Sequence, residues 1–256
     1  MIDLKGAKIL VTRPKGQSEN LCQLINKSGG NAVEFPTINI VLCDDLTVEK
    51  VNKLLTDASH VIFISRNAVQ CINKLIVDVS ILVRDKSVFA IGNGTAMEML
   101  NIGLNHFDYP SSNFGSEALL KLEGLKEHGI CNKNILIIRG DGGRELLKET
   151  LQERGANVQY ASIYRSIMPD VTQNLIESIW KDLIPDIIVI TSNQGLDNLI
   201  EMTGNRYKEI LLGRMLIVMS SRIANTAINK GFARPPMVVA DQSDDGIMAA
   251  IVQCVE

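Results

Sequence analysis

Short apolar runs alternate with amphipathic stretches along the chain, and this alternation predicts strands that are each followed by a helix. Short uninterrupted apolar runs are typical of strands buried in a parallel sheet. Such runs occupy residues 8–12, 61–64, 88–91, 135–138, 187–190 and 216–219, and longer extended stretches occupy 32–42 and 158–165. Helical periodicity occurs at residues 17–28, 46–55, 65–75, 92–103, 116–122, 146–155, 172–182, 191–200, 220–232 and 243–252. This order of elements predicts an α/β protein with parallel sheets.

Capping signals agree with these boundaries. Ser65 precedes a helical pattern and is a predicted N-cap, because its hydroxyl can accept a hydrogen bond from a free N–H group of the first turn. The inner face of that helix would hold Val69, Ile72 and Leu75. Gly155 follows the helix that begins near residue 146 and is a predicted C-terminal cap, because glycine adopts the left-handed conformation without strain.

The sequence repeats itself once, at a spacing of 126 to 128 residues. Residues 8–38 resemble residues 134–164, so that Arg13 matches Arg139. The later stretches match in the same order, with 61–73 on 187–200, 88–103 on 216–231 and 115–122 on 243–252. A repeat of this length indicates two copies of one α/β unit.

Two extended segments, residues 32–42 and 158–168, suggest that the copies exchange their first βα pieces. The first segment is long for one strand and contains Pro36, which is tolerated only at an edge or a break. We interpret both as segments that leave one domain and cross into the other. Domain one would comprise residues 1–37 and 169–256, domain two residues 42–163, and residues 38–41 and 164–168 would be two hinge strands. Two sequential domains without exchange are the alternative.

Composition favours a soluble cytoplasmic protein. The 256 residues are 46% hydrophobic and 21% charged with a net charge of −3, which supports a packed core and argues against a dedicated nucleic-acid binder. No apolar run approaches the roughly 20 residues of a membrane helix, and the N-terminus lacks the layout of a signal peptide. The five cysteines include no CxxC pair and are expected to be reduced thiols. We therefore expect a monomer that binds neither nucleic acid nor membrane.

The turns that follow the predicted strands carry candidate anion donors. In an open parallel sheet, ligands bind at the carboxyl ends of the strands, where the N–H groups of the following helices attract anions. Hydroxyl, amide and glycine residues fill these turns, at residues 12–16, 65–67, 92–95, 139–143, 191–193 and 220–222. Cations accompany them, namely Arg13, Lys15, Arg66, Arg139, Arg144 and Arg222. Two facing domains with such turns would line a cleft that suits a ligand with several carboxylates or phosphates.

Several familiar signatures are absent from these turns. Residues 92–95 do not form a GxGxxG fingerprint, and residues 139–145 lack the GK[ST] of a P-loop. The histidines have no ligand-like spacing, so no metal site is expected, and no GxSxG or Cys–His signature stands out. Structural roles remain open, because glycines can serve tight turns, hydroxyls can cap helices, and Arg13 and Arg139 can pair with carboxylates across the hinge. The sequence predicts anion donors with little acid–base machinery.

Six motifs follow one another along the chain, namely ILVTRPKGQSENL, FISRNAV, FAIGNGTA, ILIIRGDGGRELLKETLQERGANV, ASIYRS and ITSNQGL. Together they resemble the uroporphyrinogen-III synthase family over essentially the full chain. The most specific part is the RGxGGRELLxxxLxxRGAxV run followed by a tyrosine. The resemblance implies two flavodoxin-like α/β/α domains joined by a two-stranded hinge, with the exchange described above.

The resemblance also implies an activity. The family consists of cyclising hydro-lyases of tetrapyrrole biosynthesis, on the route to haem and sirohaem, that use no cofactor. The substrate is hydroxymethylbilane, a linear tetrapyrrole with eight carboxylates, and the product is uroporphyrinogen III, formed through an azafulvene and a spiro-pyrrolenine with inversion of ring D and loss of water. Because the bilane closes spontaneously to the uninverted isomer, the enzyme mainly holds one conformation and assists the departing hydroxide. A transient contact with hydroxymethylbilane synthase is the implied partner interaction.

The resemblance assigns roles to individual residues. Tyr164, in the second crossing segment, is the implied catalytic residue, whose phenol would donate a hydrogen bond to the departing hydroxyl; packing within the hinge is its alternative role. The matching residue of the first copy is Ile38. Ile223 stands where the family often has a threonine, which puts the carboxylate contacts of that turn in doubt. The candidate substrate-binding residues are Arg13, Lys15, Ser65, Arg66, Asn67, Asn93, Thr95, Arg139, Gly140, Thr191, Ser192, Asn193, Ser220 and Ser221.

Two other functions fit the same pattern. A non-enzymatic, two-lobed binding protein that closes around a small polyanionic ligand has a similar architecture. Such a protein would not need the hydroxyl of Tyr164, and the missing export signal disfavours a periplasmic receptor. A synthase relative that has lost turnover is the other alternative, and Ile223 is its only support.

Overall fold

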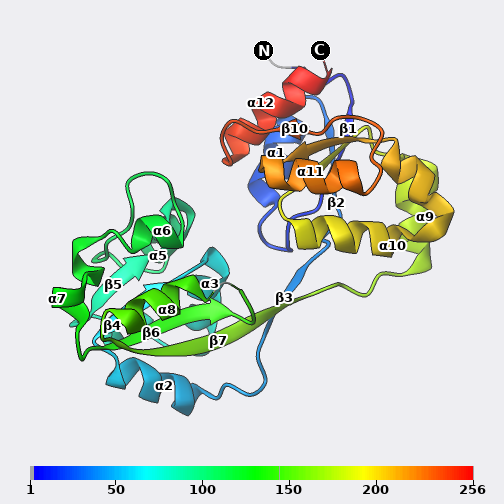
Figure 1. Cartoon of the computed structure of the whole chain (residues 1–256). Coiled ribbons are helices and arrows are strands. Elements are labelled where there is room, and N and C mark those ends of the chain that lie inside the picture. Colours follow the sequence, from blue (N-terminus) through cyan, green and yellow to red (C-terminus); the bar gives the residue numbers. More distant parts are fainter. Residues whose placement is uncertain (1–2, 144, 256) are drawn as a thin grey trace. The chain divides into compact units, whose positions relative to one another are not determined.

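The computed structural model describes residues 3–143 and 145–255, which form two compact units (Figure 1). Unit one combines the residues up to Asn39 with those from Ile167 onward, and unit two is Ile40–Ser166. Each unit holds one five-stranded sheet. Parallel pairing joins the strands of sheet one and strands β4 to β7 of sheet two. The predicted α/β class with parallel sheets is therefore confirmed.

Sheet one has the strand order β10-β9-β8-β1-β2. Its strands are β1 (Lys8–Val11), β2 (Asn31–Glu34), β8 (Ile187–Ile190), β9 (Met215–Val218) and β10 (Met237–Val238). The helices of unit one are α1 (Glu19–Lys27), α9 (Gln173–Glu177), α10 (Asn193–Leu212), α11 (Ser221–Asn229) and α12 (Asp244–Val255), with a π-helical turn over Ser178–Leu183. Their apolar faces close one continuous core, in which Trp180 is fully buried.

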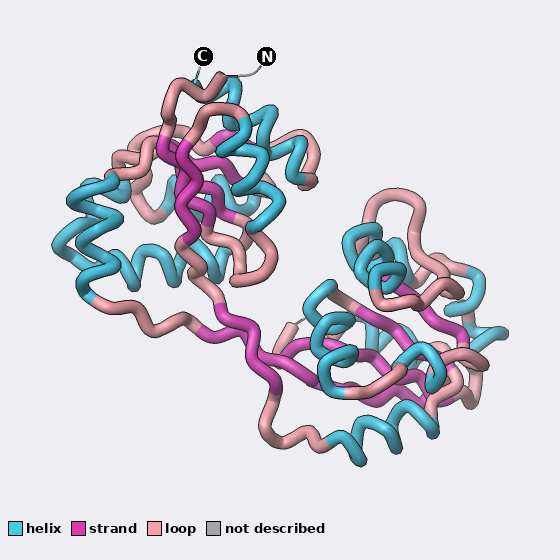
Figure 2. Tube along the Cα trace, turned by 180° about the vertical axis from the view of Figure 1, so that it is seen from behind, coloured by secondary structure: helices cyan, strands magenta, loops and turns pink. Residues whose placement is uncertain are grey.

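Sheet two has the strand order β3-β7-β6-β4-β5. Its strands are β3 (Asn39–Leu42), β4 (His60–Phe63), β5 (Ser87–Ala90), β6 (Asn134–Gly140) and β7 (Asn157–Ile167). The helices of unit two are α2 (Val48–Asp57), α3 (Arg66–Leu75), α4 (Val79–Leu82), α5 (Asn93–Asn101), α6 (Ser116–Leu119), α7 (Glu127–Ile130) and α8 (Leu146–Glu153), with a 3-10 turn over Glu123–Leu125. Figure 2 shows helices flanking the strands of this unit.

Alternation along the central strands divides the core of unit two into two layers. Leu136 and Ile138 of β6 pack with the apolar faces of α2, α3 and α5. Ile135 and Ile137 point to the opposite side and pack with α6, α7 and α8. Because successive side chains of a strand point to opposite faces, a run that is apolar throughout is buried on both sides. Unit two is therefore a three-layer α/β/α arrangement.

The extended stretch 32–42 is interrupted at the segment that contains Pro36, as predicted, and its two strands, β2 and β3, lie in different sheets. The observed elements depart from the predicted ones in three places. Helix α2 begins at Val48 rather than residue 46, because Thr47 accepts a hydrogen bond from the N–H of Lys50 at 3.3 Å. The helix predicted at 172–182 is short and passes into a π-helical turn. Helix α10 continues to Leu212 across a kink at Gly204, where φ is 67°.

Among the described residues, no helix has both the length and the apolar character that crossing a bilayer requires.

His60, at the start of β4, is a buried histidine that is expected to make the stability of unit two sensitive to acid. The ring is 7% exposed and stacks on Phe89, with 6.1 Å between the ring centroids. Burial lowers the pKa of His60 below its ordinary value of 6.5, and Lys133 acts in the same direction. A lowered folded-state pKa contributes stability that is complete above the unfolded value and is lost as pH falls through the folded value.

We therefore expect the free energy of unfolding to decrease as pH falls below about 6.5, and His60→Gln to remove part of that decrease. Urea denaturation followed by circular dichroism across this pH range measures both. His106→Gln, a substitution of an exposed histidine, is the matched control and should leave the pH dependence in place. The same pH dependence in His60→Gln and in the unsubstituted protein would contradict the assignment.

Candidate active site

The polar turns predicted from the sequence lie at the carboxyl ends of parallel strands in both units. In sheet one, β2 lies on one side of β1 and the later strands β8, β9 and β10 lie on the other, so the strand order has its switch point between β1 and β8. In sheet two the corresponding switch point lies between β6 and β4. Ligands of open α/β sheets bind at the carboxyl ends of the strands, at such switch points. Arg13 and Thr191 follow β1 and β8, whereas Gly140 and Ser65 stand at the ends of β6 and β4.

Tyr164 is turned onto the α3 face of sheet two by an irregularity in the strand pairing. Arg139 of β6 pairs with Ser162 of β7, but the next residue, Gly140, pairs with Tyr164. Ile163 is therefore an extra residue of β7, and a bulge of this kind re-aims the side chain that follows. As a result, Ile163 and Tyr164 both pack against the apolar cluster that includes α3, although they are adjacent in the strand.

The phenol of Tyr164 is held by its neighbours in unit two. Its oxygen lies 2.9 Å from Oγ of Ser65, which also caps α3 by accepting from the N–H of Ala68 at 3.0 Å. The ring lies directly against Gly140, where a Cβ atom would be 2.6 Å from Cζ of Tyr164. The N–H of Asp141 donates to the carbonyl of Tyr164 at 2.7 Å. The N-cap role predicted for Ser65 is confirmed, and the same hydroxyl contacts the predicted catalytic residue.

The first turns of α3 and α5 bring further polar groups to this edge. The guanidinium of Arg66 lies over Gly94, where a Cβ atom would be 2.9 Å from Nε. Arg66 and Asn93 are exposed and Asn67 is partly buried. Thr95 is 4% exposed, so of the two predicted residues in the turn of α5 only Asn93 is at the surface. These turns offer a cation, amide groups and helix N-terminal N–H groups to an anion.

The guanidinium of Arg139 is engaged within unit two. The residue is 3% exposed and donates to the carbonyls of Gly140 and Gly142 and to the carboxylate of Glu145. Its guanidinium also lies 4.3 Å from the ring centroid of Tyr160. Arg139 thus pairs with a carboxylate of its own unit, whereas the sequence led us to expect a partner across the hinge. Arg144, a further cation expected in this turn, lies outside the described residues.

The predicted binding residues that follow β8 and β9 in unit one lie at the N-termini of α10 and α11. Ser192 caps α10 by accepting from the N–H of Gly195 at 3.0 Å, while Thr191 is partly buried. The Oδ1 atom of Asn193 is buried without a hydrogen-bond partner among the described residues.

Ser220 precedes α11, but its side chain accepts no capping hydrogen bond, and Ser221 is exposed. Ile223 is 3% exposed and packs in the core of unit one. The position at which the resemblance led us to expect a threonine is therefore part of the packed core, below the polar edge formed by the two serines.

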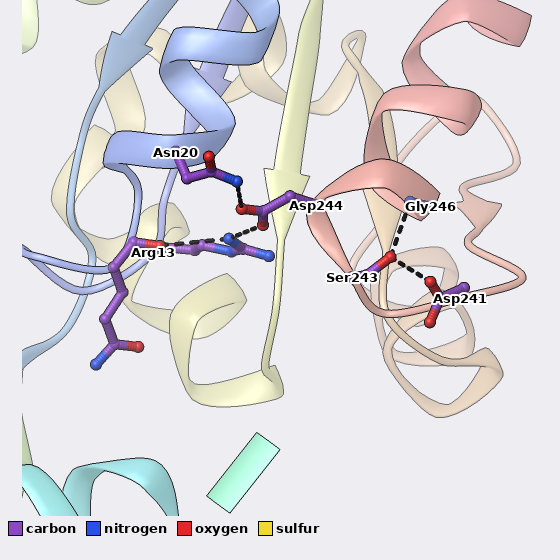
Figure 3. Close-up of polar contacts among 7 residues, drawn as sticks. Arg13, Asn20, Asp241, Ser243, Asp244 and Gly246 are labelled. Atoms are coloured by element: carbon purple, nitrogen blue, oxygen red, sulfur yellow. Dashed lines mark hydrogen bonds and ion pairs between the residues drawn. The ribbon is translucent and has the colours of Figure 1, made fainter. Parts of the chain in front are cut away.

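Arg13 ties the end of β1 to the last helix of unit one (Figure 3). Its Nη1 lies 2.5 Å from Oδ1 of Asp244, and Asn20 donates to the other carboxylate oxygen at 2.6 Å. Ser243 caps the same helix by accepting from the N–H of Gly246 at 3.1 Å. The Arg13 side chain is 12% exposed, so its charge is largely used by this ion pair. Lys15, in the same turn, is exposed.

The sequence interpretation missed two residues that pack around the turn after β6, namely Glu145 and, from β7, Tyr160. Tyr160 donates to Oε2 of Glu145 at 2.9 Å. Burial raises the pKa of Tyr160 to about 12, with the Glu145 carboxylate adding to the effect, so the phenol remains a proton donor at neutral pH. Strand alternation places Tyr160 on the same face as Val158, toward α8, and could have revealed Tyr160 from the sequence. Among the described residues, no group of three or more histidine, cysteine or acidic side chains is placed to hold a metal ion.

Comparison with known proteins gives a consistent result. The family model described as "Uroporphyrinogen-III synthase HemD" matches residues 19–249. Uroporphyrinogen-III synthase of Salmonella typhimurium is 33% identical over 96% of this chain and 99% of that protein. The protein of the same name from Escherichia coli K12 is 31% identical with the same coverage. These relatives are named for an activity of the cyclising lyase class.

Solved structures agree in fold. The crystal structure of uroporphyrinogen-III synthetase from Helicobacter pylori matches with a TM-score of 0.65 at 13% identity, over 96% of this chain and 99% of that one. A mutant uroporphyrinogen III synthase from Thermus thermophilus matches with a TM-score of 0.56 at 17% identity, over the same shares. At such identities the likeness concerns the fold, whereas the family model and the relatives identify the family. The chain belongs to the uroporphyrinogen-III synthase family.

Proposed function

We propose that this chain converts hydroxymethylbilane to uroporphyrinogen III, with inversion of ring D and loss of water. The observation that carries the proposal is the phenol of Tyr164, held 2.9 Å from Ser65 at the carboxyl edge of sheet two. A tyrosine hydroxyl close to helix N-termini and to the exposed guanidinium of Arg66 suits a substrate that has many carboxylates and one hydroxyl to lose. In this proposal the reaction needs no cofactor, because the substrate supplies its own leaving group and nucleophile.

Departure of the terminal hydroxyl is the step that needs a group of the protein. As the C–O bond breaks, the electron pair stays on oxygen and the remaining fragment is an azafulvenium cation. Loss of its pyrrole N–H proton gives the neutral azafulvene, and that proton and the hydroxide together make up the water that is released. Tyr164 donates its hydrogen bond to the departing oxygen, where negative charge develops, so the contact strengthens toward the transition state. Ring closure through the spiro-pyrrolenine then depends on the conformation in which the bound chain is held.

In the proposed arrangement, Ser65 donates its hydroxyl proton to the oxygen of Tyr164 while its Oγ accepts from the N–H of Ala68. In that arrangement the proton of Tyr164 points away from Ser65 and toward the substrate. Because Ser65 caps α3 and also donates to Tyr164, the hydroxyl proton of Tyr164 is left to form a hydrogen bond with the substrate.

Substrate carboxylates are the proposed ligands of polar groups at the strand ends of each unit, some exposed and some partly buried. In unit two these are the N-terminal turns of α3 and α5 with Arg66, Asn67 and Asn93. The corresponding groups of unit one are Lys15, Thr191, Ser192, Asn193, Ser220 and Ser221. Arg13 and Thr95, which are mostly buried, support these turns from below. We also propose that the enzyme works as a cytoplasmic monomer and contacts hydroxymethylbilane synthase only transiently.

Product analysis tests the function directly. The purified protein is mixed with freshly prepared hydroxymethylbilane, and the oxidised porphyrin isomers are separated by chromatography. Predominantly isomer III is the expected result. Isomer I alone, as in the protein-free control, would refute the enzymatic function and leave a polyanion-binding protein as the remaining function.

We also propose that the two units arose by duplication of one α/β unit, and that the two copies exchanged their first βα pieces. The order β9-β8-β1-β2 in sheet one corresponds to β5-β4-β6-β7 in sheet two, element for element. The repeat in the sequence pairs the same elements. In this proposal, domain one corresponds to residues 1–37 and 169–256 and domain two to residues 42–163. The segments 38–41 and 164–168 carry the chain between them as hinge strands.

A further inference from the structure

We infer that Arg139 is a positioning residue, which holds the turn after β6 so that Tyr164 keeps its place on the opposite face of the sheet. The inference rests on the role proposed above for Tyr164. Arginine side chains normally reach solvent, and a buried one is expected to have its donors satisfied. Arg139 meets this condition entirely through the turn that follows it.

Three nitrogen atoms of Arg139 reach three points along that turn. Nε donates to the carbonyl of Gly140 at 3.2 Å, and Nη1 donates to Oε1 of Glu145 at 3.2 Å. Nη2 donates to the carbonyl of Gly142. Because the guanidinium is planar and its donors are fixed relative to one another, the three acceptors are held in one geometry. An ammonium group cannot reproduce this pattern.

Neighbouring residues keep the guanidinium in that position. The ring of Tyr160 lies beneath it, and the Tyr160 hydroxyl holds the second oxygen of Glu145 at 2.9 Å. Gly143 closes the other side with a φ of +114°, and a Cβ atom there would be 2.6 Å from Nη2 of Arg139. The turn therefore packs around the arginine, and its backbone conformation at this point favours glycine.

The turn transmits this geometry to Tyr164. Gly140, whose carbonyl accepts from Arg139, lies against the Tyr164 ring on the other face of the sheet. Asp141, the next residue, donates its N–H to the Tyr164 carbonyl at 2.7 Å. The strand irregularity that turns Tyr164 toward α3 falls between Arg139 and Gly140. A shift of the turn would therefore move both the ring and the backbone of Tyr164.

Direct binding of a substrate carboxylate by Arg139 fits these contacts poorly. Each guanidinium nitrogen already has an acceptor, and the side chain is 3% exposed. A carboxylate would have to displace Glu145 or open the turn, whereas the exposed guanidinium of Arg66 needs no such change. The observed geometry thus points to support of Tyr164 rather than to ligand binding.

A double-mutant cycle on turnover tests the inference. We expect Arg139→Lys to lower kcat for isomer III about tenfold when Tyr164 is present, but less than about twofold in the Tyr164→Phe background, because residues that act through one another are non-additive. The KM should change little, because the binding turns of α3 and α5 are untouched. Equal losses in both backgrounds, or no loss at all, would overturn the inference. Should Arg139→Lys fail to fold, Tyr160→Phe takes its place with the same expected pattern.

Fluorine NMR gives a readout that does not require activity. The chain has four tyrosines, and Tyr164→Phe assigns the Tyr164 signal in protein labelled with 3-fluorotyrosine. That signal should shift or broaden in Arg139→Lys. Lys148→Gln, which removes a cation 4.7 Å from the Tyr160 ring centroid, is the matched control and should leave it unchanged.

The two readouts separate the inference from the proposed function. An unchanged Tyr164 signal in Arg139→Lys overturns the inference even if the unsubstituted protein forms isomer III. If the unsubstituted protein forms no isomer III, the proposed function fails, and the NMR signal still decides whether Arg139 positions Tyr164.

Discussion

Replacement of Tyr164 with phenylalanine should lower the turnover of hydroxymethylbilane by about a hundredfold, the lower end of the usual contribution of a positioned proton donor. The ring would keep its packing against Gly140 and the α3 cluster, and Ser65 would still cap α3. Folding should therefore be retained, and the isomer ratio should move toward isomer I, because spontaneous closure would compete with the slowed enzyme. Initial rates and isomer ratios from chromatography measure both effects.

Tyr109→Phe is the matched control for this substitution. Tyr109 is 37% exposed and contacts Phe107, and it has no contact with the proposed site among the described residues. Its variant should turn over substrate at the unsubstituted rate. If Tyr164→Phe also did so, Tyr164 would be removed from the mechanism and its hydroxyl would serve only the contact with Ser65.

Gly140→Ala should damage both turnover and stability. The added methyl group would lie 2.6 Å from Cζ and 2.7 Å from Cε2 of Tyr164, so the ring or the strand must shift. Overpacking of this kind typically lowers stability by about 1–3 kcal/mol. Because the displaced atoms belong to the proposed donor, we expect turnover to fall at least about tenfold, as a misplacement of about 1 Å can cause.

Gly129→Ala is the control for a methyl group added to a glycine of the same unit. A Cβ atom at Gly129 would meet its nearest neighbour at 3.5 Å, an ordinary contact. Thermal unfolding and initial rates should therefore be close to those of the unsubstituted protein. A Gly140→Ala variant with full turnover would show that the position of the Tyr164 ring is unimportant for catalysis.

The strands were predictable because burial on both faces leaves a plain pattern. All four residues of β4 and of β8 are buried, and apart from His60 at the start of β4 both strands are apolar throughout. The caps were equally predictable where a local hydroxyl serves a helix, as Ser65 and Ser192 do. Elements set by distant contacts were not, and the two-residue strand β10 is an example.

The sequence indicated which residues lie near the candidate site better than it indicated where their side chains point. Arg139 was expected to offer its charge to a ligand, yet strand alternation puts it on the α8 face with Ile135 and Ile137. Tyr164 should have shared the face of Tyr160 by the same alternation, and the extra residue in β7 reverses that. No local pattern signals such a bulge, because it depends on the register between two strands. The kink at Gly204 was not predictable either, since a glycine within a helix does not by itself end it.

The strand order of sheet one also sets the sequence of events during synthesis on the ribosome. Strand β1 pairs on one side with β2 but on the other with β8, which is translated much later. At usual elongation rates the delay is roughly ten to thirty-five seconds. Unit two is continuous in the chain, so it can fold during this interval. Strands β1 and β2 meanwhile lack β8, and the edge of β1 that pairs with β8 stays unpaired. The nascent chain is therefore most exposed to aggregation and chaperone binding at its beginning, until its last third has emerged.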